Sequence, residues 1–492
     1  MTTDSILDLP VENSFARLPE AFYARVQPHP LTAPRLLHAN ARVAALLGLS
    51  EDALGRQDFL DVCAGNRPLT GGRTVAAVYS GHQFGVWAGR LGDGRAHLLG
   101  EIATPSGPWE IQLKGSGHTP YSRMADGRAV LRSCVREYLA SEAMAGLGIP
   151  TTRALALVVS DDPVYRETVE TAAILARVSP SFVRFGSFEH WWNDAENMRA
   201  LLDYVVGHFY PRCGRGDDGG VLSTPDTALR LLDAVVLRTA ELIAAWMTVG
   251  FCHGVMNTDN MSILGLTLDY GPYGFMDGFR ADHVCNHSDT QGRYAWNMQP
   301  AVAGWNLYRL ADALMVLGLD ADALKARLNA FEPAFLRAYQ ARMAAKLGLG
   351  AWLPADQALI DGWWRLLHEA RADFTLSFRR LARVEDDAEP FLSLFGDRAP
   401  ALEWLEKYRR RLEADPRPSD ERAARMDRVN PLYVLRNHLA ELAIRGAHLG
   451  DVSEINTLLM LLRDPYTERD GYGDYAAPAP AWAGGLEVSC SS

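Results

Sequence analysis

The chain has 492 residues, of which 48% are hydrophobic and 22% are charged, a composition that excludes a disordered chain and allows a large apolar core. At roughly 100–200 residues per domain, this length allows about two to four units. The formal net charge of −11 disfavours nucleic acid as a partner, because an acidic protein repels a phosphate backbone.

The six cysteines are scattered without a C-x-x-C pair, so we expect neither a zinc ribbon nor a dense disulfide framework, and the pattern fits a reducing cytoplasm. The first ten residues contain Asp4 and Asp8 and no basic residue, which is not the pattern of a secretory signal. The segment Leu229–Val249 is apolar but carries four charged residues, so we expect a buried amphipathic helix and no membrane span.

Residues 1–75 are expected to form an N-terminal extension that is partly helical over Arg35–Leu47. Residues 76–187 are rich in β-formers and contain one helix, from about Arg128 to Ala145, ended by Gly146 and Gly148. The predicted strands are Ala96–Ile102, Trp109–Leu113, Ala154–Val159 and Thr171–Val178. The predicted turns between them are Gly92-Asp93-Gly94, Gly115-Ser116-Gly117 and Asp161-Asp162-Pro163.

Residues 188–464 are predicted to be mostly helical. A strong helix starts at Thr224-Pro225, where a capping residue precedes a proline, and runs to Val249. Asp415–Asp420 is expected to be an exposed connection, and residues 465–492 an irregular tail. Strands with one helix, followed by many helices, predict an α+β fold with two lobes and a nucleotide cleft between them.

Two features in the β-rich region are candidates for phosphate binding. The segment Gly89–Arg95 could cradle phosphates with its backbone, although in isolation a common Asp-Gly hairpin turn is the better explanation. Lys114 ends a strand, and a lysine in this position holds phosphates in kinases when a glutamate on the next helix orients it. Glu137 is the best placed glutamate, with Glu142 as a fallback on the same helix.

The third candidate is the segment Phe251–Asn260, which follows the long helix. It keeps the kinase spacing from His253 to Asn260, and Asp269-Tyr270-Gly271 stands where kinases have Asp-Phe-Gly, after two short β-like runs, Met261–Leu264 and Leu266–Leu268. An amide and a carboxylate supply the oxygen ligands that Mg²⁺ prefers. We therefore expect Asn260 and Asp269 to bind a divalent cation.

The kinase catalytic aspartate is replaced by Val255, which cannot accept a proton. Asp259 is the nearby carboxylate that could serve as the general base instead. Arg177 and Arg184 could contact phosphates in bidentate fashion, although ordinary surface charge explains them equally well from sequence alone.

These residues resemble the selenoprotein O family, which is called YdiU in bacteria. The resemblance is carried by Tyr79–Gly85, Gly89–Arg95, Ile111–Gly115 and His253–Asn260, and it extends from about residue 15 to the end of the chain. It implies a protein-kinase-like fold that binds ATP flipped relative to kinases, so that the γ-phosphate is buried and AMP passes to a protein hydroxyl as pyrophosphate leaves.

The resemblance also implies roles for individual residues. Asp259 is the implied proton acceptor, Asn260 and Asp269 are the implied ligands of Mg²⁺ (or Mn²⁺), and Glu137 orients Lys114. The implied contacts to ATP are Gly92, Gly94, Arg95, Lys114, Asp126, Gly127, Arg177, Arg184 and Asp269. The implied partners are ATP and proteins with Ser, Thr or Tyr hydroxyls, and we expect a monomer.

Two other functions stay open on the sequence: a kinase that transfers the γ-phosphate with Asp259 as base, and an inactive ATP-binding scaffold, which Val255 favours. Family members carry selenocysteine near the C-terminus in some organisms, and here Cys490 stands in that region. We therefore hypothesise a disulfide between Cys285 and Cys490, with two free thiols as the equal alternative.

Overall fold

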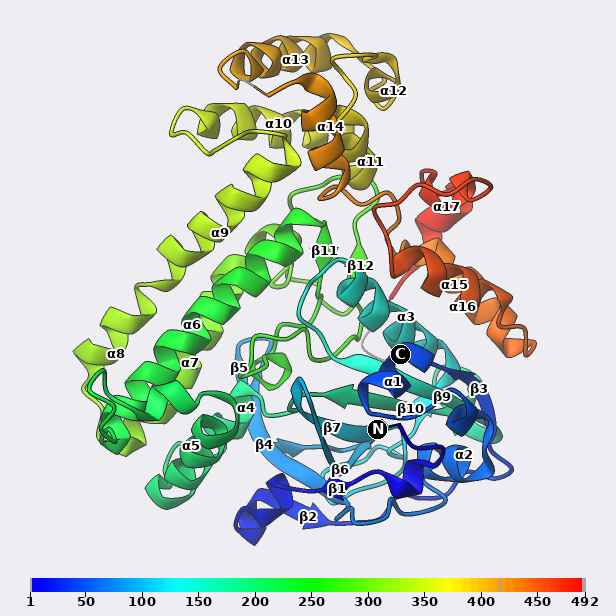
Figure 1. Ribbon diagram of the computed structural model, residues 1–492, viewed down its shortest axis with the longest axis vertical. Coiled ribbons are helices and arrows are strands. Elements are labelled where there is room, and N and C mark those ends of the chain that lie inside the picture. Colours follow the sequence, from blue (N-terminus) through cyan, green and yellow to red (C-terminus); the bar gives the residue numbers. More distant parts are fainter. Residues whose placement is uncertain (1, 416, 489–492) are drawn as a thin grey trace.

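The computed structural model describes residues 2–415 and 417–488. The strands gather in one part of the molecule and long helices extend away from them (Figure 1), so the predicted mixture of sheet and helix is confirmed. The comparison with protein kinases, and the division into an extension, two lobes and a tail, remain predictions. No helix of the described residues is both long and apolar enough to cross a lipid bilayer.

Ten strands form one sheet whose main path runs β2-β4-β6-β7-β10-β9-β3, with antiparallel neighbours throughout. Off this path, β1 pairs with β6, β5 with β4 and β8 with β10. The strands are β1 (Val11–Glu12), β2 (Tyr23–Arg25), β3 (Arg35–Ala39), β4 (Val75–Gln83), β5 (Val86–Gly92), β6 (Ala96–Thr104), β7 (Gly107–Lys114), β8 (Ala129–Val130), β9 (Arg153–Tyr165) and β10 (Val169–Ser179). A further pair, β11 (Phe251–Cys252) and β12 (Gly274–Phe275), stands apart from this sheet.

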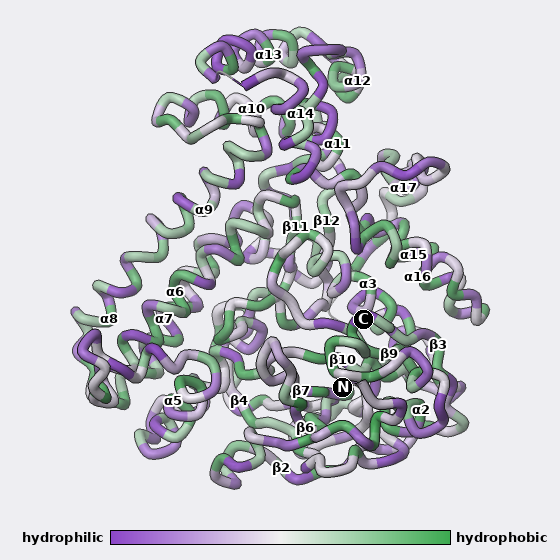
Figure 2. Tube along the Cα trace, viewed as in Figure 1, coloured by the Kyte–Doolittle hydropathy of each residue, from purple (hydrophilic) through white to green (hydrophobic). Residues whose placement is uncertain are grey.

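The central strands are buried on both faces because their alternate side chains enter two different cores. In β10, Ile174 packs with the N-terminal helices α1 (Ala41–Leu46) and α2 (Gln57–Cys63), whereas Leu175 packs in the core that contains α3 (Leu131–Gly146). Figure 2 shows the hydrophobic colour concentrated around β9 and β10. Residues 1–75 thus cover one face of the sheet and also contribute strands β1, β2 and β3 to it.

The helices after the sheet are arranged in three groups (Figure 1). Helices α6 to α9 run alongside one another, α10 to α14 gather at the far end, and α15 and α16 return to pack against α3. Their bounds are α4 (Phe185–Glu189), α5 (Ala195–Phe209), α6 (Thr224–Thr248), α7 (Gln299–Leu314), α8 (Ala321–Leu328), α9 (Phe331–Lys346), α10 (Asp356–Ala370), α11 (Phe374–Leu381), α12 (Glu389–Leu392), α13 (Ala399–Leu412), α14 (Ser419–Asp427), α15 (Asn437–His448), α16 (Ser453–Leu462) and α17 (Gly473–Ala476). As predicted, α6 starts at Thr224, but the capping residue is Ser223 rather than Thr224, and its hydroxyl accepts the Asp226 N–H.

Several local predictions were wrong. The predicted turn at Asp161-Asp162-Pro163 lies inside β9, and the chain turns only after Tyr165. The segment Arg35–Leu47 is partly helical as expected, with α1 over Ala41–Leu46, but its first residues form strand β3, which pairs with β9. The expected hairpin over 261–268 is a single bridge between Met261 and Thr267. Asp415 is buried against Arg417 rather than exposed.

Candidate active site

The site is built around the carboxylate of Asp269, which follows the Met261–Thr267 bridge. Lys114 Nζ, at the end of β7, lies 3.1 Å from Asp269 Oδ1 and 2.5 Å from Glu137 Oε2 on α3. The predicted pairing of Lys114 with Glu137 is thus present in the structure. The fallback, Glu142, is engaged elsewhere, with Arg153 at 2.7 Å and Arg463 at 3.3 Å.

Two buried arginines reach the same carboxylate. Arg177 Nη1 lies 2.5 Å from Asp269 Oδ1 and 2.9 Å from Glu137 Oε1, and Arg184 Nη1 lies 3.1 Å from Asp269 Oδ2. Both arginines are only 3% exposed, so ordinary surface charge does not explain them. Burial by itself favours the neutral acid, but Lys114 and the two arginines hold the pKa of Asp269 well below its usual range.

The sheet register explains why these groups meet. Arg177 on β10 stands opposite Gln112 on β7, and Leu175 stands opposite Lys114, so Lys114 and Arg177 lie on one face of neighbouring strands. Gln112 Oε1 accepts hydrogen bonds from Arg177 Nε and Nη2 at 2.9 and 2.7 Å. The guanidinium is therefore fixed before any ligand binds.

Asp259 lies beside this cluster and is nearly buried. Its Oδ2 accepts a hydrogen bond from Gln83 Nε2 at 3.1 Å, and its Oδ1 is buried without a hydrogen-bond partner among the described residues. Burial raises the pKa of Asp259 to about 6. A carboxylate whose pKa is raised towards neutrality is suited to act as a general base.

The hairpin of β4 and β5 grips the loop that carries Asp259, a relationship that the sequence analysis did not find. His82 N–H donates to Thr258 Oγ1 at 2.7 Å, and Phe84 N–H donates to Asn257 Oδ1 at 3.2 Å. A Cβ on Gly81 would lie 2.9 Å from Thr258 Oγ1 and 3.1 Å from Asp259 Oδ1. The sequence signal for this contact was the motif Gly81–Gly85, which served above only as part of the family resemblance.

The tip of this hairpin is strained. Phe84 has φ +51°, a left-handed conformation that a bulky residue adopts at a cost of about 1–3 kcal/mol. Its N–H also donates to the Tyr294 hydroxyl at 2.9 Å, and that hydroxyl donates to Asn257 Oδ1 at 2.6 Å. These bonds hold the strained residue against the loop.

His253 and Asn260 frame the same loop. Val255 N–H donates to His253 Nδ1 at 3.3 Å, the His253 ring stacks on Trp246, and burial lowers its pKa to about 4, so His253 is a neutral structural residue. Asn260 Nδ2 donates to the Val255 carbonyl at 3.0 Å, which turns the amide oxygen the other way. Arg184 Nη1 binds the Asp259 carbonyl at 2.7 Å as well as Asp269, and so ties Asp269 to the residue next to Asn260.

A divalent cation fits the donors that are present. The amide oxygen of Asn260 and the carboxylate of Asp269 are hard oxygen ligands, and Mg²⁺ commonly uses one or two such groups together with phosphates and water. Among the described residues, no group of three or more His, Cys, Asp or Glu side chains is arranged to hold a metal ion by itself. Substrate oxygens would therefore have to complete the coordination.

The glycine segment forms a turn from β5 into β6 rather than a hairpin, because β5 pairs with β4. A Cβ on Gly92 would lie 2.4 Å from the Tyr121 ring, and one on Gly94 would lie 2.9 Å from the Tyr121 carbonyl oxygen, so the turn packs closely on the loop after β7. Arg95 is exposed. Its charge lowers the pKa of Cys134, as does that of Lys114, whereas the charge of Glu137 raises it. The turn therefore lies near the lysine.

Asp126 and Gly127 lie on the loop after β7, and the structure does not bring them into the cluster of ion pairs at Asp269. Asp126 pairs with Arg166 at 2.7 Å, and Gly127 packs on Gly117, where a Cβ would lie 2.3 Å from the carbonyl carbon. Gly127 has φ +71°, so a side chain there is disfavoured by conformation as well as by space.

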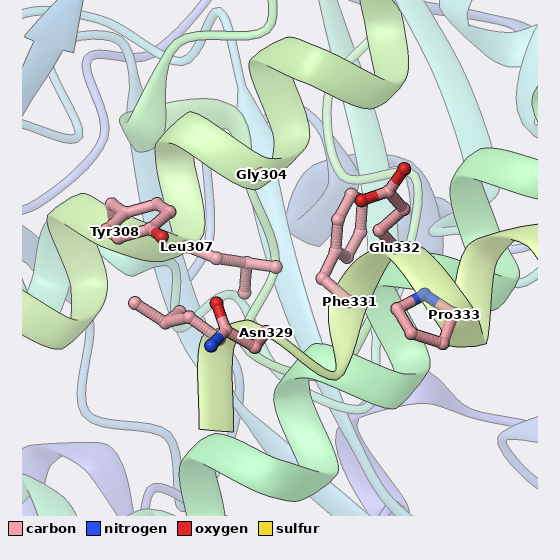
Figure 3. A pocket seen from close by; sticks show the side chains of 8 residues that line it. Gly304, Leu307, Tyr308, Asn329, Phe331, Glu332 and Pro333 are labelled. Atoms are coloured by element: carbon pink, nitrogen blue, oxygen red, sulfur yellow. The ribbon is translucent and has the colours of Figure 1, made fainter. Parts of the chain in front are cut away.

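Two cavities lie away from these residues. One of about 400 Å³, between α7 and the start of α9 (Figure 3), is lined by Gly304, Leu307, Tyr308, Leu328, Asn329, Phe331, Glu332 and Pro333. Another of about 550 Å³ lies at the end of α9 near Trp352 and Arg417. Neither is lined by a residue that contacts Asp269 or Asp259.

Of the two cysteines in the disulfide hypothesis, only Cys285 lies within the described residues. Its thiol donates to the carbonyl oxygens of Pro272 at 3.0 Å and Cys252 at 3.3 Å. Cys490 lies outside the described residues. The carbonyl oxygen of Val488, the last described residue, accepts a hydrogen bond from His287 N–H at 2.9 Å. His287 lies two residues after Cys285 in the sequence.

Comparison with known proteins agrees with this geometry. Residues 5–463 match the family described as protein adenylyltransferase SelO. The chain is 64% identical to the protein nucleotidyltransferase YdiU of Bordetella petrii, over 100% of both chains. It is 54% identical to that of Dechloromonas aromatica, over 98% of this chain and 99% of the relative. It is 50% identical to that of Cupriavidus pinatubonensis, over 98% and 95%. The chain therefore belongs to the protein adenylyltransferase SelO family of enzymes.

Proposed function

We propose that this chain transfers AMP from ATP to Ser, Thr or Tyr hydroxyls of proteins and releases pyrophosphate, with Mg²⁺ as its metal ion and Mn²⁺ as an alternative. The observation that carries the proposal is the convergence of Lys114, Arg177 and Arg184 on one carboxylate, Asp269. Three cations fixed in a buried site provide the charge neutralisation that phosphoryl chemistry requires. The names of the relatives and of the family supply the kind of group that is transferred.

The depth of the cations supports a flipped orientation of ATP. Arg177 and Arg184 are 3% exposed, whereas the Lys114 side chain is 13% exposed. The γ-phosphate, which carries the most negative charge, would bind the deeper arginines, and the α-phosphate would then lie further out, towards the acceptor. Lys114, held by Glu137, would bridge the phosphates as a point charge.

Asp259 would take the proton of the acceptor hydroxyl, while Gln83 donates a hydrogen bond to its Oδ2. As the acceptor oxygen bonds to the α-phosphorus, the bond from that phosphorus to the bridging oxygen breaks and pyrophosphate leaves. A bound Mg²⁺ would neutralise phosphate charge, and Asn260 and Asp269 would hold it. The turn Gly92–Arg95 and the loop with Asp126 and Gly127 would enclose the nucleotide.

Label transfer tests the proposal against a kinase that uses the same residues. The purified chain is incubated with Mg²⁺, an acceptor protein and ATP labelled at either the α- or the γ-phosphate. Label from the α-phosphate, with an AMP-sized gain in intact mass that the Asp269→Ala variant lacks, is the expected result. Label from the γ-phosphate would show a kinase, and ATP binding without either label would favour the inactive scaffold.

A further inference from the structure

Three apolar side chains are exposed at the tip of the β4–β5 hairpin, which grips the loop that carries Asp259. Phe84 is 39% exposed, Val86 70% and Trp87 44%. Gln83, which binds the Asp259 carboxylate, directly precedes this group. Exposed apolar side chains gathered beside polar ones are typical of a binding surface, and this one adjoins the proposed base.

The tip is held rigidly. His82 Nδ1 lies 2.5 Å from Glu189 Oε1 on α4, and the His82 ring packs edge-on against Trp87 and Trp305, with centroids 5.0 and 5.3 Å away. Phe84 is fixed by the two hydrogen bonds to its N–H described above. A surface that is ordered before binding loses little entropy when a partner docks.

Two arginines without an ion pair among the described residues lie along the hairpin, Arg293 at its tip and Arg90 further along β5, opposite Ser80. The guanidinium of Arg293 lies 4.8 Å from the Trp305 ring, and a Cβ on Gly85 would lie 2.9 Å from its Cζ. Arg90, on β5, lies 5.3 Å from the Tyr121 ring. On a chain with net charge −11, this local positive charge is complementary to an acidic segment.

The strand β5 also has a free edge. It pairs with β4 and, among the described residues, with no other strand. A register shift between Ser80 and His82 bends the hairpin. An unpaired edge can accept an extended segment through backbone hydrogen bonds.

We propose that Phe84, Val86, Trp87, Arg90 and Arg293 form the docking surface for the polypeptide that accepts the nucleotide. Its partner is an extended segment with an apolar side chain and nearby Asp or Glu residues. This inference rests on the proposed function, because it assigns the substrate side of the same site. A segment docked on this tip passes close to Asp259, whose carboxylate is bound by the neighbouring Gln83.

The test measures docking directly, so that its result does not depend on turnover. Two fluorescein-labelled peptides of equal length are used, one with a central Leu-Ser-Phe flanked by Asp and Glu, the other with Lys in place of each acid. Fluorescence anisotropy with the full chain is expected to show at least tenfold tighter binding of the acidic peptide. The double variant Val86→Ser, Trp87→Ala is expected to weaken that binding at least tenfold.

Trp482→Ala is the matched control, because Trp482 is 47% exposed and lies on the C-terminal segment. This control is expected to bind the acidic peptide as the wild type does. If the double variant does not fold, as judged by circular dichroism, Arg90→Glu replaces it and is expected to invert the preference between the two peptides. ATP affinity is expected to stay within twofold in the double variant and in Trp482→Ala.

Equal binding of both peptides, unchanged binding by the variants, or no binding to the wild type would overturn the proposal. A concentration-dependent dimer that Trp87→Ala abolishes would also overturn it, because the surface would then bind a second copy of the chain. Docking with no AMP transfer to the peptide would instead count against the proposed function alone.

Discussion

Lys114 and Asp269 lie 155 residues apart in the sequence, and their side chains meet at 3.1 Å. Lys114 lies at the end of strand β7, and Asp269 lies after the loop that carries Asp259. Their contact joins the two motifs that the sequence analysis could relate only by their order along the chain, the strand that ends at Lys114 and the later segment that begins at Asp269. The predictions below test what this meeting point does.

Removing the Asp269 charge is expected to abolish transfer while the protein stays folded. In Asp269→Asn, the three cations keep their positions through Glu137, Gln112 and the Asp259 carbonyl, but one proposed metal ligand is weakened. We expect AMP transfer to fall by a factor on the order of 10² or more. Intact-mass analysis of an acceptor after incubation with ATP measures it, and near-normal transfer would remove Asp269 from the mechanism.

Replacing Asp259 is expected to act on chemistry rather than on nucleotide binding. In Asp259→Asn, the side chain keeps its size but cannot accept the hydroxyl proton, so transfer is expected to fall by about 10²–10⁴. ATP affinity, measured by calorimetry, is expected to change little. A variant that still transfers AMP at the wild-type rate would require a different base.

Glu137 is expected to support stability as well as activity. It accepts hydrogen bonds from both Lys114 and Arg177, and Arg177 is almost fully buried. Glu137→Ala leaves these cations short of a counter-charge and is expected to cost about 3–5 kcal/mol in urea unfolding. The control Glu389→Ala breaks an exposed pair with Arg398 and is expected to cost less than about 1 kcal/mol. Equal losses would contradict the role of Glu137.

A methyl group on Gly81 is expected to displace the loop that carries Thr258 and Asp259. The added Cβ would lie 2.9 Å from Thr258 Oγ1 and 3.1 Å from Asp259 Oδ1, closer than such contacts normally allow. We expect Gly81→Ala to slow transfer at least about tenfold, because small displacements of a base are costly. Gly207→Ala, where nothing lies within 4 Å of the new Cβ, is the control and should behave as the wild type.

Glu110 predicts a pH effect on stability that is independent of the active site. Its carboxyl is buried, with one oxygen accepting the Phe182 N–H at 2.7 Å and the other without a partner, and burial raises its pKa from 4.5 to about 8. The folded state therefore favours the protonated form, and the stability it contributes is lost as pH rises from about 4.5 through 8.

The variant Glu110→Gln stays neutral and should not lose this stability. At pH 9 we expect it to be more stable than the wild type, by about 5 kcal/mol at 1.36 kcal/mol per pKa unit. The difference should shrink towards pH 4, and urea unfolding across this range measures it. A constant difference at all pH values would show that Glu110 does not titrate in this window.

The hypothesis of a bond between Cys285 and Cys490 remains to be tested by mass mapping of the non-reduced protein. Val488, the last described residue, lies beside the segment that contains Cys285, because its carbonyl oxygen accepts the His287 N–H. A linked pair of peptides that reduction separates is the expected result. Two unlinked peptides after mild oxidation would leave both cysteines as free thiols.

The site was more predictable from sequence than its surroundings. Lys114, Glu137 and Asp269 could be found because kinase-like chemistry fixes the order and spacing of these residues along the chain. Arg177 and Arg184 were assigned to ATP only through the family resemblance, because the residues alone left ordinary surface charge as an equal explanation until their burial was known. The grip of Gly81 and Gln83 on Asp259 joins residues about 176 positions apart, and no local periodicity encodes such a contact.

The same limit applies to the fold. The long helix α6 was predicted from its cap, its proline and its apolar period, all of which are local. The strand β3, which precedes α1 in the segment expected to be partly helical, was missed because its identity depends on pairing with β9, more than one hundred residues later. Asp161-Asp162-Pro163 looks like a turn, yet Pro163 stands opposite Thr171 within the ladder.

The return of α15 to α3 limits how far the protein can be shortened. Arg136, beside Glu137, donates to the Tyr273 carbonyl at 2.8 Å and to Asn437 Oδ1 at 3.3 Å, so the helix that orients Lys114 is braced by the start of α15. All proposed phosphate and metal contacts precede residue 270, but a fragment cut there would lose this brace. A minimal catalytic version of the enzyme must therefore keep its last helices.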